Sequence, residues 1–328
     1  MAKTINWGII GTGWIADKMA TALNFLEDAN LAAVGSRTLE KAQRFAQQFQ
    51  IPRAYGSYEE LAADPDIDII YIATPHSEHY ANVKLCLENG KHVLNEKAFC
   101  VNKKQAEEVI ELAREKKLFL MEALWTRFQP AANALVKTIR DGVIGDVHML
   151  KAELCFLLNR DKEFRLLNPN LAGGALLDVG IYPITMASLV FGSRPQKVVT
   201  HAVMGETGVD ERDCINLFYE DGKFASLVAA IDTEGSNTAY IYGTKGQIMV
   251  PQDWCPESFT VKTYADNKET TYKLPFSCNG YEYEAACAMD CIREGKLESE
   301  IMPHSTTLEI MELLDSIRDQ WGLRYPFE

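Results

Sequence analysis

The sequence predicts an α/β protein of two domains: an N-terminal doubly wound parallel sheet, and a C-terminal α+β domain with a large, mainly antiparallel open sheet. The chain has 328 residues, which is longer than a chain that folds around a single hydrophobic core usually is. Up to about residue 124, short apolar runs alternate with helical patterns, as in parallel sheets with crossover helices. Beyond Trp125 the runs are longer and alternating, with turn residues between them. We therefore place the domains at residues 1–124 and 125–328.

The individual elements follow from the same patterns. In the first domain we expect strands at 5–10, 31–34, 67–73, 92–95 and 119–123, and helices at 15–25, 39–49, 79–89 and 103–116. In the second domain we expect strands at 148–157, 198–204, 214–219, 224–232, 238–242 and 259–264, and helices at 281–294 and 306–321. Asp221-Gly222 and Lys245-Gly246 are typical of hairpin turns.

The first strand ends in a glycine-rich turn, Gly11-Thr-Gly13-Trp14-Ile15-Ala16. Gly11 allows a tight turn, Gly13 removes a side chain that would hold a phosphate away from the backbone, and Ala16 lets the helix pack closely on the strand. The N–H groups at the start of that helix favour an anion. An ordinary strand-to-helix loop is the alternative. The apolar run before the turn and the helical stretch after it favour a Rossmann-type dinucleotide site.

The end of the second expected strand reads Gly35-Ser36-Arg37-Thr38. An NAD site usually places a carboxylate here for the ribose 2′-hydroxyl. Instead, Arg37 can pair with a 2′-phosphate, and the hydroxyls of Ser36 and Thr38 can donate to it. Thr38 can also cap the next helix, with Arg37 solvated. The segment favours NADP as the cofactor, with NAD as the alternative.

Composition narrows the function classes. The formal charge of −13 argues against a nucleic acid or an anionic membrane as partner. The chain runs from Met1 directly into its first strand, which leaves no room for a signal peptide, so we expect a cytoplasmic protein. The most apolar stretch, 173–191, is interrupted by Asp178 and Pro183, so we expect no membrane span. Eight scattered cysteines without a C-x-x-C pair indicate reduced thiols, and we expect no metal site.

Two further motifs carry chemistry. Glu96-Lys97 ends an expected parallel strand, where this fold places residues that contact ligands. Gly173-Gly-Ala-Leu-Leu-Asp178-Val-Gly-Ile-Tyr182 places Asp178 and Tyr182 four residues apart, on one helical face. Taken alone, the first motif could be a solvated ion pair and the second a helix start capped by Asp178.

Taken together, the chain resembles the Gfo/Idh/MocA oxidoreductase family. The resemblance rests on Gly11-x-Gly13-x-x-Ala16, Ala73-Thr-Pro-His76, Glu96-Lys97 and Asp178-x-x-x-Tyr182. Longer strings resemble the branch that acts on aldoses and cyclic dihydrodiols, namely 121–128, Gly173 to Tyr182, Glu206-Thr-Gly-Val-Asp210, Ser236-Asn-Thr-Ala239 and Gly243-Thr-Lys-Gly246. The family usually has proline after the lysine, where this chain has Ala98.

The resemblance implies roles for the site residues. Tyr182 takes the place of the general acid/base, Lys97 lowers the pKa of its phenol, and Asp178 orients the substrate. The residues implied along the nicotinamide half of the cofactor are Tyr71, Thr74, His76, His79, Glu96 and Lys97. Trp125, Trp254 and Phe156 are implied for substrate binding, since aromatic faces suit a sugar ring or cyclic diol.

The implied activity is hydride transfer between NADP and a secondary alcohol or carbonyl of an aldopyranose or a trans-dihydrodiol. Oxidation of inositol or another polyol, and a non-catalytic NADP-binding regulator, are the alternatives. The implied assembly is a homodimer. Residues 224–231 are apolar on both alternating faces, so either helices of the same chain or the matching sheet of a second subunit must cover the second face.

Overall fold

The computed structural model describes residues 3–158, 161 and 164–328. The chain forms two compact units. The first comprises Met1–Trp125 and Ser277–Leu308, and the second comprises Thr126–Phe276 and Glu309–Glu328.

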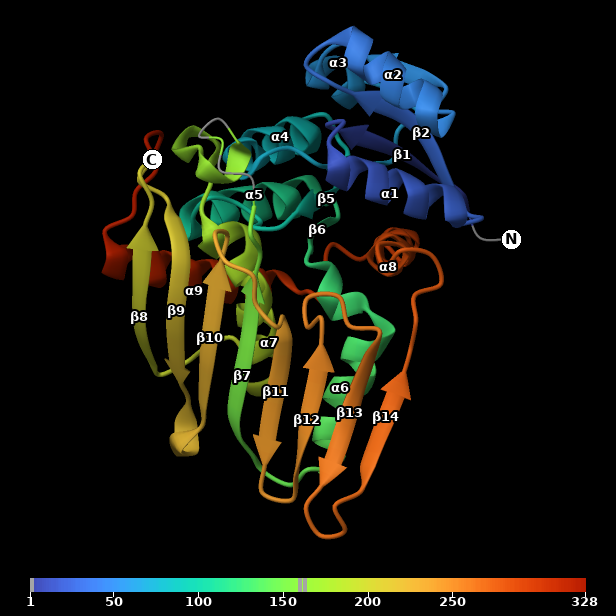
Figure 1. Ribbon diagram of the computed structural model, residues 1–328. Helices are drawn as coiled ribbons and strands as arrows, with labels where there is room; N and C mark the ends of the chain where they lie inside the picture. Colours follow the sequence, from blue (N-terminus) through green and yellow to red (C-terminus); the bar gives the residue numbers. More distant parts are fainter. Residues whose placement is uncertain (1–2, 159–160, 162–163) are drawn as a thin grey trace. The chain divides into compact units, whose positions relative to one another are not determined.

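The first unit is built on a six-stranded sheet in the order β3-β2-β1-β4-β5-β6, with every pair parallel (Figure 1). Its strands are β1 (Ile5–Ile10), β2 (Ala29–Gly35), β3 (Arg53–Tyr55), β4 (Ile69–Ile72), β5 (His92–Glu96) and β6 (Leu120–Ala123). This is the strand order of a dinucleotide-binding fold. The five strands expected from the sequence are present, and β3 is an addition.

Among its described residues, the first unit has five helices in the connections between these strands and one further helix, α8, that joins it from the C-terminal part of the chain. They are α1 (Trp14–Phe25), α2 (Leu39–Phe49), α3 (Tyr58–Ala62), α4 (His76–Glu88), α5 (Lys103–Lys116) and α8 (Glu282–Arg293). The central strands β1 and β4 are almost wholly buried, as expected for a parallel sheet covered on both faces. Helix α4 begins at His76, three residues before the predicted start, because Pro75 in extended conformation occupies its N-cap.

The second unit holds an eight-stranded sheet in the order β14-β13-β12-β11-β7-β10-β9-β8. Its strands are β7 (Val147–Cys155), β8 (Lys197–Met204), β9 (Asp210–Phe218), β10 (Phe224–Ala230), β11 (Thr238–Gly243), β12 (Gly246–Pro251), β13 (Ser258–Thr263) and β14 (Glu269–Lys273). Only the β7–β10 pair is parallel. The predicted fold class is confirmed. Strands β12 and β14 are additions to the prediction.

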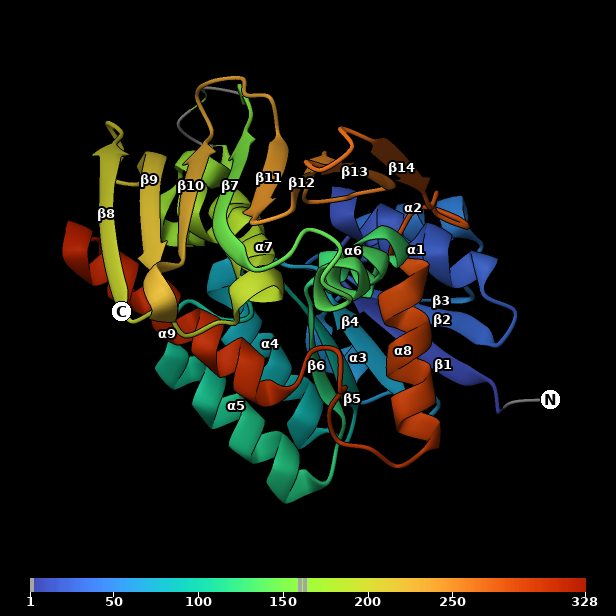
Figure 2. The ribbon, with the colours of Figure 1, turned by 90° about the horizontal axis from the view of Figure 1, so that it is seen from below.

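The helices of the second unit cover one face of this sheet. Figures 1 and 2 show α6 (Pro130–Arg140) and α7 (Ile181–Phe191) on the same side of it. In β10, Leu227 is fully buried on that side, whereas Val228 on the other side is 38% exposed. Helices of the same chain therefore cover one face of the apolar strand. Among the described residues, no helix lies over the other face in these views.

One helical segment, Pro169–Phe191, is long and apolar enough to span a membrane, with a mean hydropathy of 1.6. Its most apolar window is 78% buried inside the protein, which is typical of a core helix. This segment contains both Asp178 and Tyr182.

The boundary between the units differs from the predicted one in the C-terminal part of the chain. The predicted second domain runs from 125 to 328, but 277–308 belongs to the first unit. The reason is tertiary contact: α8 packs on α1 and β5, and the Leu120 N–H donates to the Leu297 carbonyl at 3.1 Å. The last helix, α9 (His304–Trp321), begins in the first unit and continues in the second.

Candidate active site

The glycine turn of the first unit has the geometry of an anion cradle. Gly11 has φ +103°, and a Cβ on it would come within 2.6 Å of the Ala73 carbonyl oxygen. A side chain is thus excluded there. Gly13 is the N-cap of α1, and the space where its Cβ would lie is open to 4 Å. Trp14 and Ile15 are the first two residues of α1, and Ala16, the third, is fully buried. A phosphate can therefore approach the helix N-terminus directly, so these residues fit a dinucleotide.

Ser36, Arg37 and Thr38 follow β2 at the same sheet edge. Thr38 is the N-cap of α2, and its hydroxyl accepts from the Lys41 N–H at 3.4 Å, as predicted for a cap. Arg37 is exposed, and its charge opposes the rise that burial causes in the pKa of Tyr58. Arg37 thus lies near Tyr58, with its guanidinium at the surface.

The His79 side chain links the loop that follows β4 to the loop that follows β5 through hydrogen bonds. It is fully buried, with Nδ1 2.9 Å from the Ala98 carbonyl oxygen and Nε2 2.9 Å from the Thr74 carbonyl oxygen. Burial lowers its pKa to about 4, although the two carbonyls oppose that shift. The ring is therefore neutral at pH 7 and donates one hydrogen bond at a time. His76 lies edge-on to it at 5.6 Å.

Tyr71 and Glu96 meet where β4 and β5 end. The fully buried Tyr71 hydroxyl donates to Glu96 Oε1, and the Lys97 backbone N–H donates to Glu96 Oε2 at 3.2 Å. The carboxyl of Glu284, on α8, lies nearby. Burial raises its pKa well above the usual range, and the charge of Glu96 adds to that rise. Tyr71 thus contributes to this edge of the sheet by orienting Glu96.

Two further features complete the Lys97 region. The Lys97–Ala98 peptide is cis. Thr74, in the loop after β4, accepts a hydrogen bond from Asn82 at 3.2 Å through its side chain.

Trp125, which ends the first segment of the first unit, is buried and stacks on Tyr281 with ring centroids 4.2 Å apart. Trp125 is therefore half of an aromatic stack within the first unit, and the substrate contact implied for it stays a prediction.

Asp178 and Tyr182 lie in the second unit on one helical segment. A π-helical turn, Leu176–Gly180, contains Asp178 and leads directly into α7, whose second residue is Tyr182. Asp178 is buried, and its Oδ1 accepts from Arg165 Nη2 at 2.9 Å. π-Helical turns occur frequently at functional sites.

Tyr182 and two of the three aromatic residues implied for substrate binding gather on one apolar cluster in the same unit. Tyr182, Phe156 and Trp254 all pack against it while remaining partly exposed. Leu158 and Phe164, which the sequence did not single out, pack there as well. Phe156 and Trp254 meet edge-to-face at 5.4 Å, and the Thr126 hydroxyl donates to the Trp254 carbonyl at 2.6 Å. The second unit thus brings a phenol, a carboxylate with its arginine, and aromatic faces into one region.

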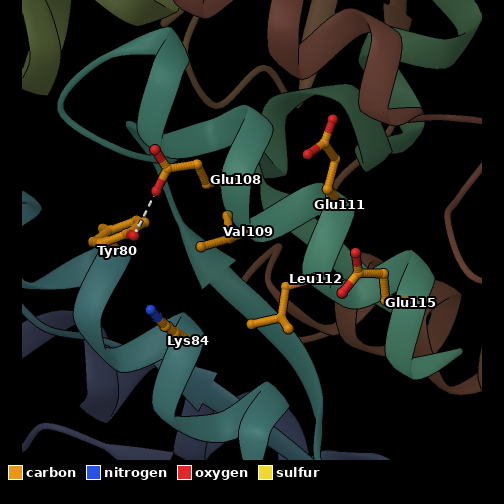
Figure 3. A pocket seen from close by; sticks show the side chains of 7 residues that line it. All are labelled: Tyr80, Lys84, Glu108, Val109, Glu111, Leu112 and Glu115. Carbon is orange, nitrogen blue, oxygen red and sulfur yellow. Dashed lines mark hydrogen bonds between the residues drawn. The ribbon is translucent and has the colours of Figure 1, made fainter.

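A separate hollow of about 230 Å³ lies between α4 and α5 (Figure 3). Its rim carries Glu108, Glu111 and Glu115 against the single cation of Lys84. Such a rim repels a phosphate. None of the site residues predicted from the sequence lines it.

Sequence reasoning missed the partners that come from distant parts of the chain. Arg165, Tyr281 and Glu284 contact Asp178, Trp125 and the Glu96 region respectively. Only Tyr281 gave a signal, as an aromatic residue at the start of a predicted helix.

Comparison with known proteins agrees with this arrangement. Residues 5–124 match the model of an oxidoreductase family with an NAD-binding Rossmann fold, and residues 133–249 match the Gfo/Idh/MocA C-terminal domain. A trans-1,2-dihydrobenzene-1,2-diol dehydrogenase from Homo sapiens is 39% identical over 332 residues, covering 98% of each chain.

Two solved structures share the fold over nearly the whole chain. An aldose-aldose oxidoreductase from Caulobacter crescentus, complexed with glycerol, has a TM-score of 0.88 at 24% identity, covering 98% of this chain and 99% of that one. A 3-ketoreductase from Actinomadura kijaniata, solved with NADP and TDP-benzene, has a TM-score of 0.87 at 24% identity, covering 97% and 98%. With its matches to both domain models and to full-length relatives, this chain belongs to the Gfo/Idh/MocA oxidoreductase family.

Proposed function

We propose that this chain is an NADP-dependent dehydrogenase that oxidises a secondary alcohol of a trans-dihydrodiol or an aldopyranose, or reduces the corresponding carbonyl. The observation that carries the proposal is the gathering of Tyr182, Phe156 and Trp254 on one apolar cluster, with Asp178 on the same helical segment as Tyr182. This set offers a proton-transfer group, an acceptor for hydroxyl groups and apolar faces for a ring. The human relative is named as a dehydrogenase of a trans-dihydrodiol, the first of these two substrate classes.

The cofactor assignment rests on the first unit. Gly11, Gly13 and the N-terminus of α1 suit a pyrophosphate, and the exposed Arg37 beside Ser36 and Thr38 suits a 2′-phosphate. Bound NADP supplies the nicotinamide carbon that accepts or releases hydride. The fold relative from Actinomadura kijaniata was solved with NADP.

Each site residue has its own role in the proposed reaction. Tyr182 takes the proton of the substrate hydroxyl, and the Lys97 ammonium favours the phenolate form of Tyr182. Asp178, held by Arg165, accepts a second substrate hydroxyl. His76 and Thr74 lie in the loop and helix start after β4, where they serve the nicotinamide half of the cofactor. His79 serves it indirectly, by tying that loop to the one that carries Lys97.

We also propose that the protein works as a cytoplasmic homodimer. All eight cysteines lie among the described residues and are free thiols, which suits a reducing compartment. The uncovered face of the eight-stranded sheet presents Val199, Val228 and Phe218 as exposed apolar side chains. A second copy can cover this face with the same residues in a two-fold arrangement.

The experiment is a screen of NADP reduction with trans-dihydrodiols, aldoses, inositol and other polyols, with Tyr182→Phe as the inactive control. The expected result is turnover of a dihydrodiol or an aldose that depends on Tyr182. Turnover of inositol alone would instead assign the polyol alternative. If NADP binds tightly but no alcohol is oxidised, the protein is a regulator and the proposal is wrong.

A further inference from the structure

Two buried carboxyl groups lie beneath the helical segment that carries Asp178 and Tyr182. Asp210 and Asp213 are 0% and 2% exposed, and both belong to β9. Residues three apart on a regular strand point to opposite faces of the sheet. Here the β8–β9 register skips Glu211, since Val203 pairs with Arg212 and Met204 pairs with Asp210. This bulge turns both carboxyls to the same side.

The first carboxyl binds the start of the helical segment. Asp210 Oδ2 accepts from the Leu176 N–H at 2.6 Å, and the Ala175 N–H is also directed to it. Leu176 is the first residue of the π-helical turn, two positions before Asp178. A carboxylate at this place satisfies N–H groups that the helix itself leaves without partners.

The neighbouring glycine makes this approach possible. Gly174 has φ +120°, and a Cβ on it would collide with Asp210 Oδ1. On the other side, the Tyr325 hydroxyl donates to the Gly173 carbonyl at 2.8 Å. Two strings that carry the family resemblance, 173–182 and 206–210, therefore meet at this contact.

The second carboxyl has one available partner. Among the described residues, no N–H or hydroxyl group donates to either oxygen of Asp213. Asp210 acts on it at close range, and a hydrogen bond between two carboxyl groups requires that one of them keeps its proton. Burial raises the pKa of Asp213 well above the usual range, and the charge of Asp210 adds to that rise. Two adjacent buried carboxylates cannot both be ionised at low cost.

Other charged groups around the pair have partners of their own. Arg318 on α9 binds Glu328 at 2.6 Å and Asp315 at 3.0 Å, and it lies over the Tyr325 ring. Arg212 on β9 pairs with Asp232 at 3.1 Å, and Asp178 on the helical segment pairs with Arg165.

Two further titratable groups among the described residues lie near the pair. They are Glu211, which directly follows Asp210, and Tyr325, whose pKa burial raises well above the usual range. The β10 strand contributes no charged side chain.

We infer that Asp210 and Asp213 share one proton and act together as positioning residues, fixing the start of the segment that presents Asp178 and Tyr182. The inference rests on the proposed function only for its effect on turnover. Neither residue is expected to touch the substrate, since both are fully buried under the segment.

The test compares Asp213→Ala with Asp213→Asn, whose amide keeps a donor to Asp210 and does not titrate. Asp213→Ala is expected to lower kcat by about 10²-fold, because small misplacements of reacting groups have effects of this size. Binding of NADP to the first unit should be unchanged. Asp213→Asn should restore most of the lost kcat. It should also lose less thermal stability than the wild type as the pH rises above the usual range of a carboxyl, because the wild-type pair keeps its shared proton only in the native state.

Hydrogen exchange at residues 174–182 provides a readout that needs no substrate, and Asp210→Asn provides a second variant should Asp213→Ala fail to fold. Exchange in this segment should be faster in Asp213→Ala and Asp210→Asn, and close to wild type in Asp213→Asn. If exchange accelerates while kcat is unchanged, the pair has no positioning role. If Asp213→Asn behaves like Asp213→Ala, no proton is shared. If the wild type oxidises no alcohol, the proposed function fails, while hydrogen exchange and the pH dependence of stability still decide whether the pair anchors the segment.

Discussion

At the residue scale, we expect Arg37 to decide the choice between NADP and NAD. It is exposed at the end of β2, next to Ser36 and the helix cap Thr38. We expect Arg37→Ala to remove about 1.5 to 3 kcal/mol of the preference for NADP over NAD, the scale of a hydrogen bond to a charged group. The measurement is the ratio of kcat/KM for the two cofactors.

Arg44 is the matched control for this prediction. It is an exposed arginine on the following helix, in a surface ion pair with Glu40 at 3.9 Å. Such pairs contribute little, so Arg44→Ala should leave the ratio unchanged. Equal losses with NADP and NAD in Arg37→Ala would mean that Arg37 has a structural role only.

His79 gives the protein a specific sensitivity to acid. Its folded-state pKa is about 4, and the unfolded value is about 6.5. The native state therefore favours the neutral ring. This contribution is fully present above pH 6.5 and is lost as the pH falls toward 4, with a total of about 3 kcal/mol. The loops after β4 and β5 should separate as the ring becomes charged.

The measurement is the free energy of unfolding at pH 7 and pH 4.5, in the wild type and in His79→Gln. Glutamine keeps a side-chain donor but does not titrate, so the difference between the two pH values should be smaller in the variant. An equal difference in both proteins would show that His79 does not carry this acid sensitivity.

Much of the site could be predicted at this scale, because its motifs are local in sequence. The spacing of Gly11 and Gly13 alone predicts a turn, and the spacing of Asp178 and Tyr182 predicts that they share a helical face. The partners of these residues could not be predicted. Arg165 and Asp210 reach the Asp178 segment through tertiary contacts. A sequence read alone gives no distance between such segments.

At the scale of elements, the strands that escaped prediction are short, fully exposed or bounded by residues that weaken a strand pattern. β3 has only three residues, and β14, Glu269–Lys273, is exposed along its whole length. It is an edge strand that pairing with β13 holds in place, and its polar side chains protect the open edge. β12 begins with a glycine and ends with a proline, which both weaken a strand signal.

The open face of the second unit's sheet carries the prediction for assembly. Val228 lies on that face, on β10, and is 38% exposed, whereas its neighbour Leu227 is buried under the helices. We expect Val228→Asp to give a monomer, because it places a charge in an apolar dimer contact. Light scattering coupled to size-exclusion chromatography measures the mass.

Val143 offers a control of equal exposure. It is also 38% exposed but lies outside the sheet, between α6 and β7. Val143→Asp should remain a dimer. If Val228→Asp also remains a dimer, the interface is not on this face.

At the scale of the whole molecule, the two compact units each hold part of the proposed machinery. Lys97 and the dinucleotide turn belong to the first unit, and Asp178 and Tyr182 belong to the second. The two-domain organisation followed from chain length and from the change in pattern near Trp125. The return of 277–308 to the first unit could not be predicted, since it depends on α8 packing against α1 and β5.

The central claim is that Lys97 and Tyr182 act together on one proton. The most direct test is a double-mutant cycle on kcat with Tyr182→Phe, Lys97→Met and the double variant, after NADP binding to each has been verified. Tyr182→Phe should lower kcat by about 10² to 10⁴, the usual contribution of general acid–base catalysis. Adding Lys97→Met to it should then cost little more, because residues that act as a unit share one effect. If the two losses multiply in full, or if Tyr182→Phe turns over normally, the two residues do not form one proton-transfer unit and the account is contradicted.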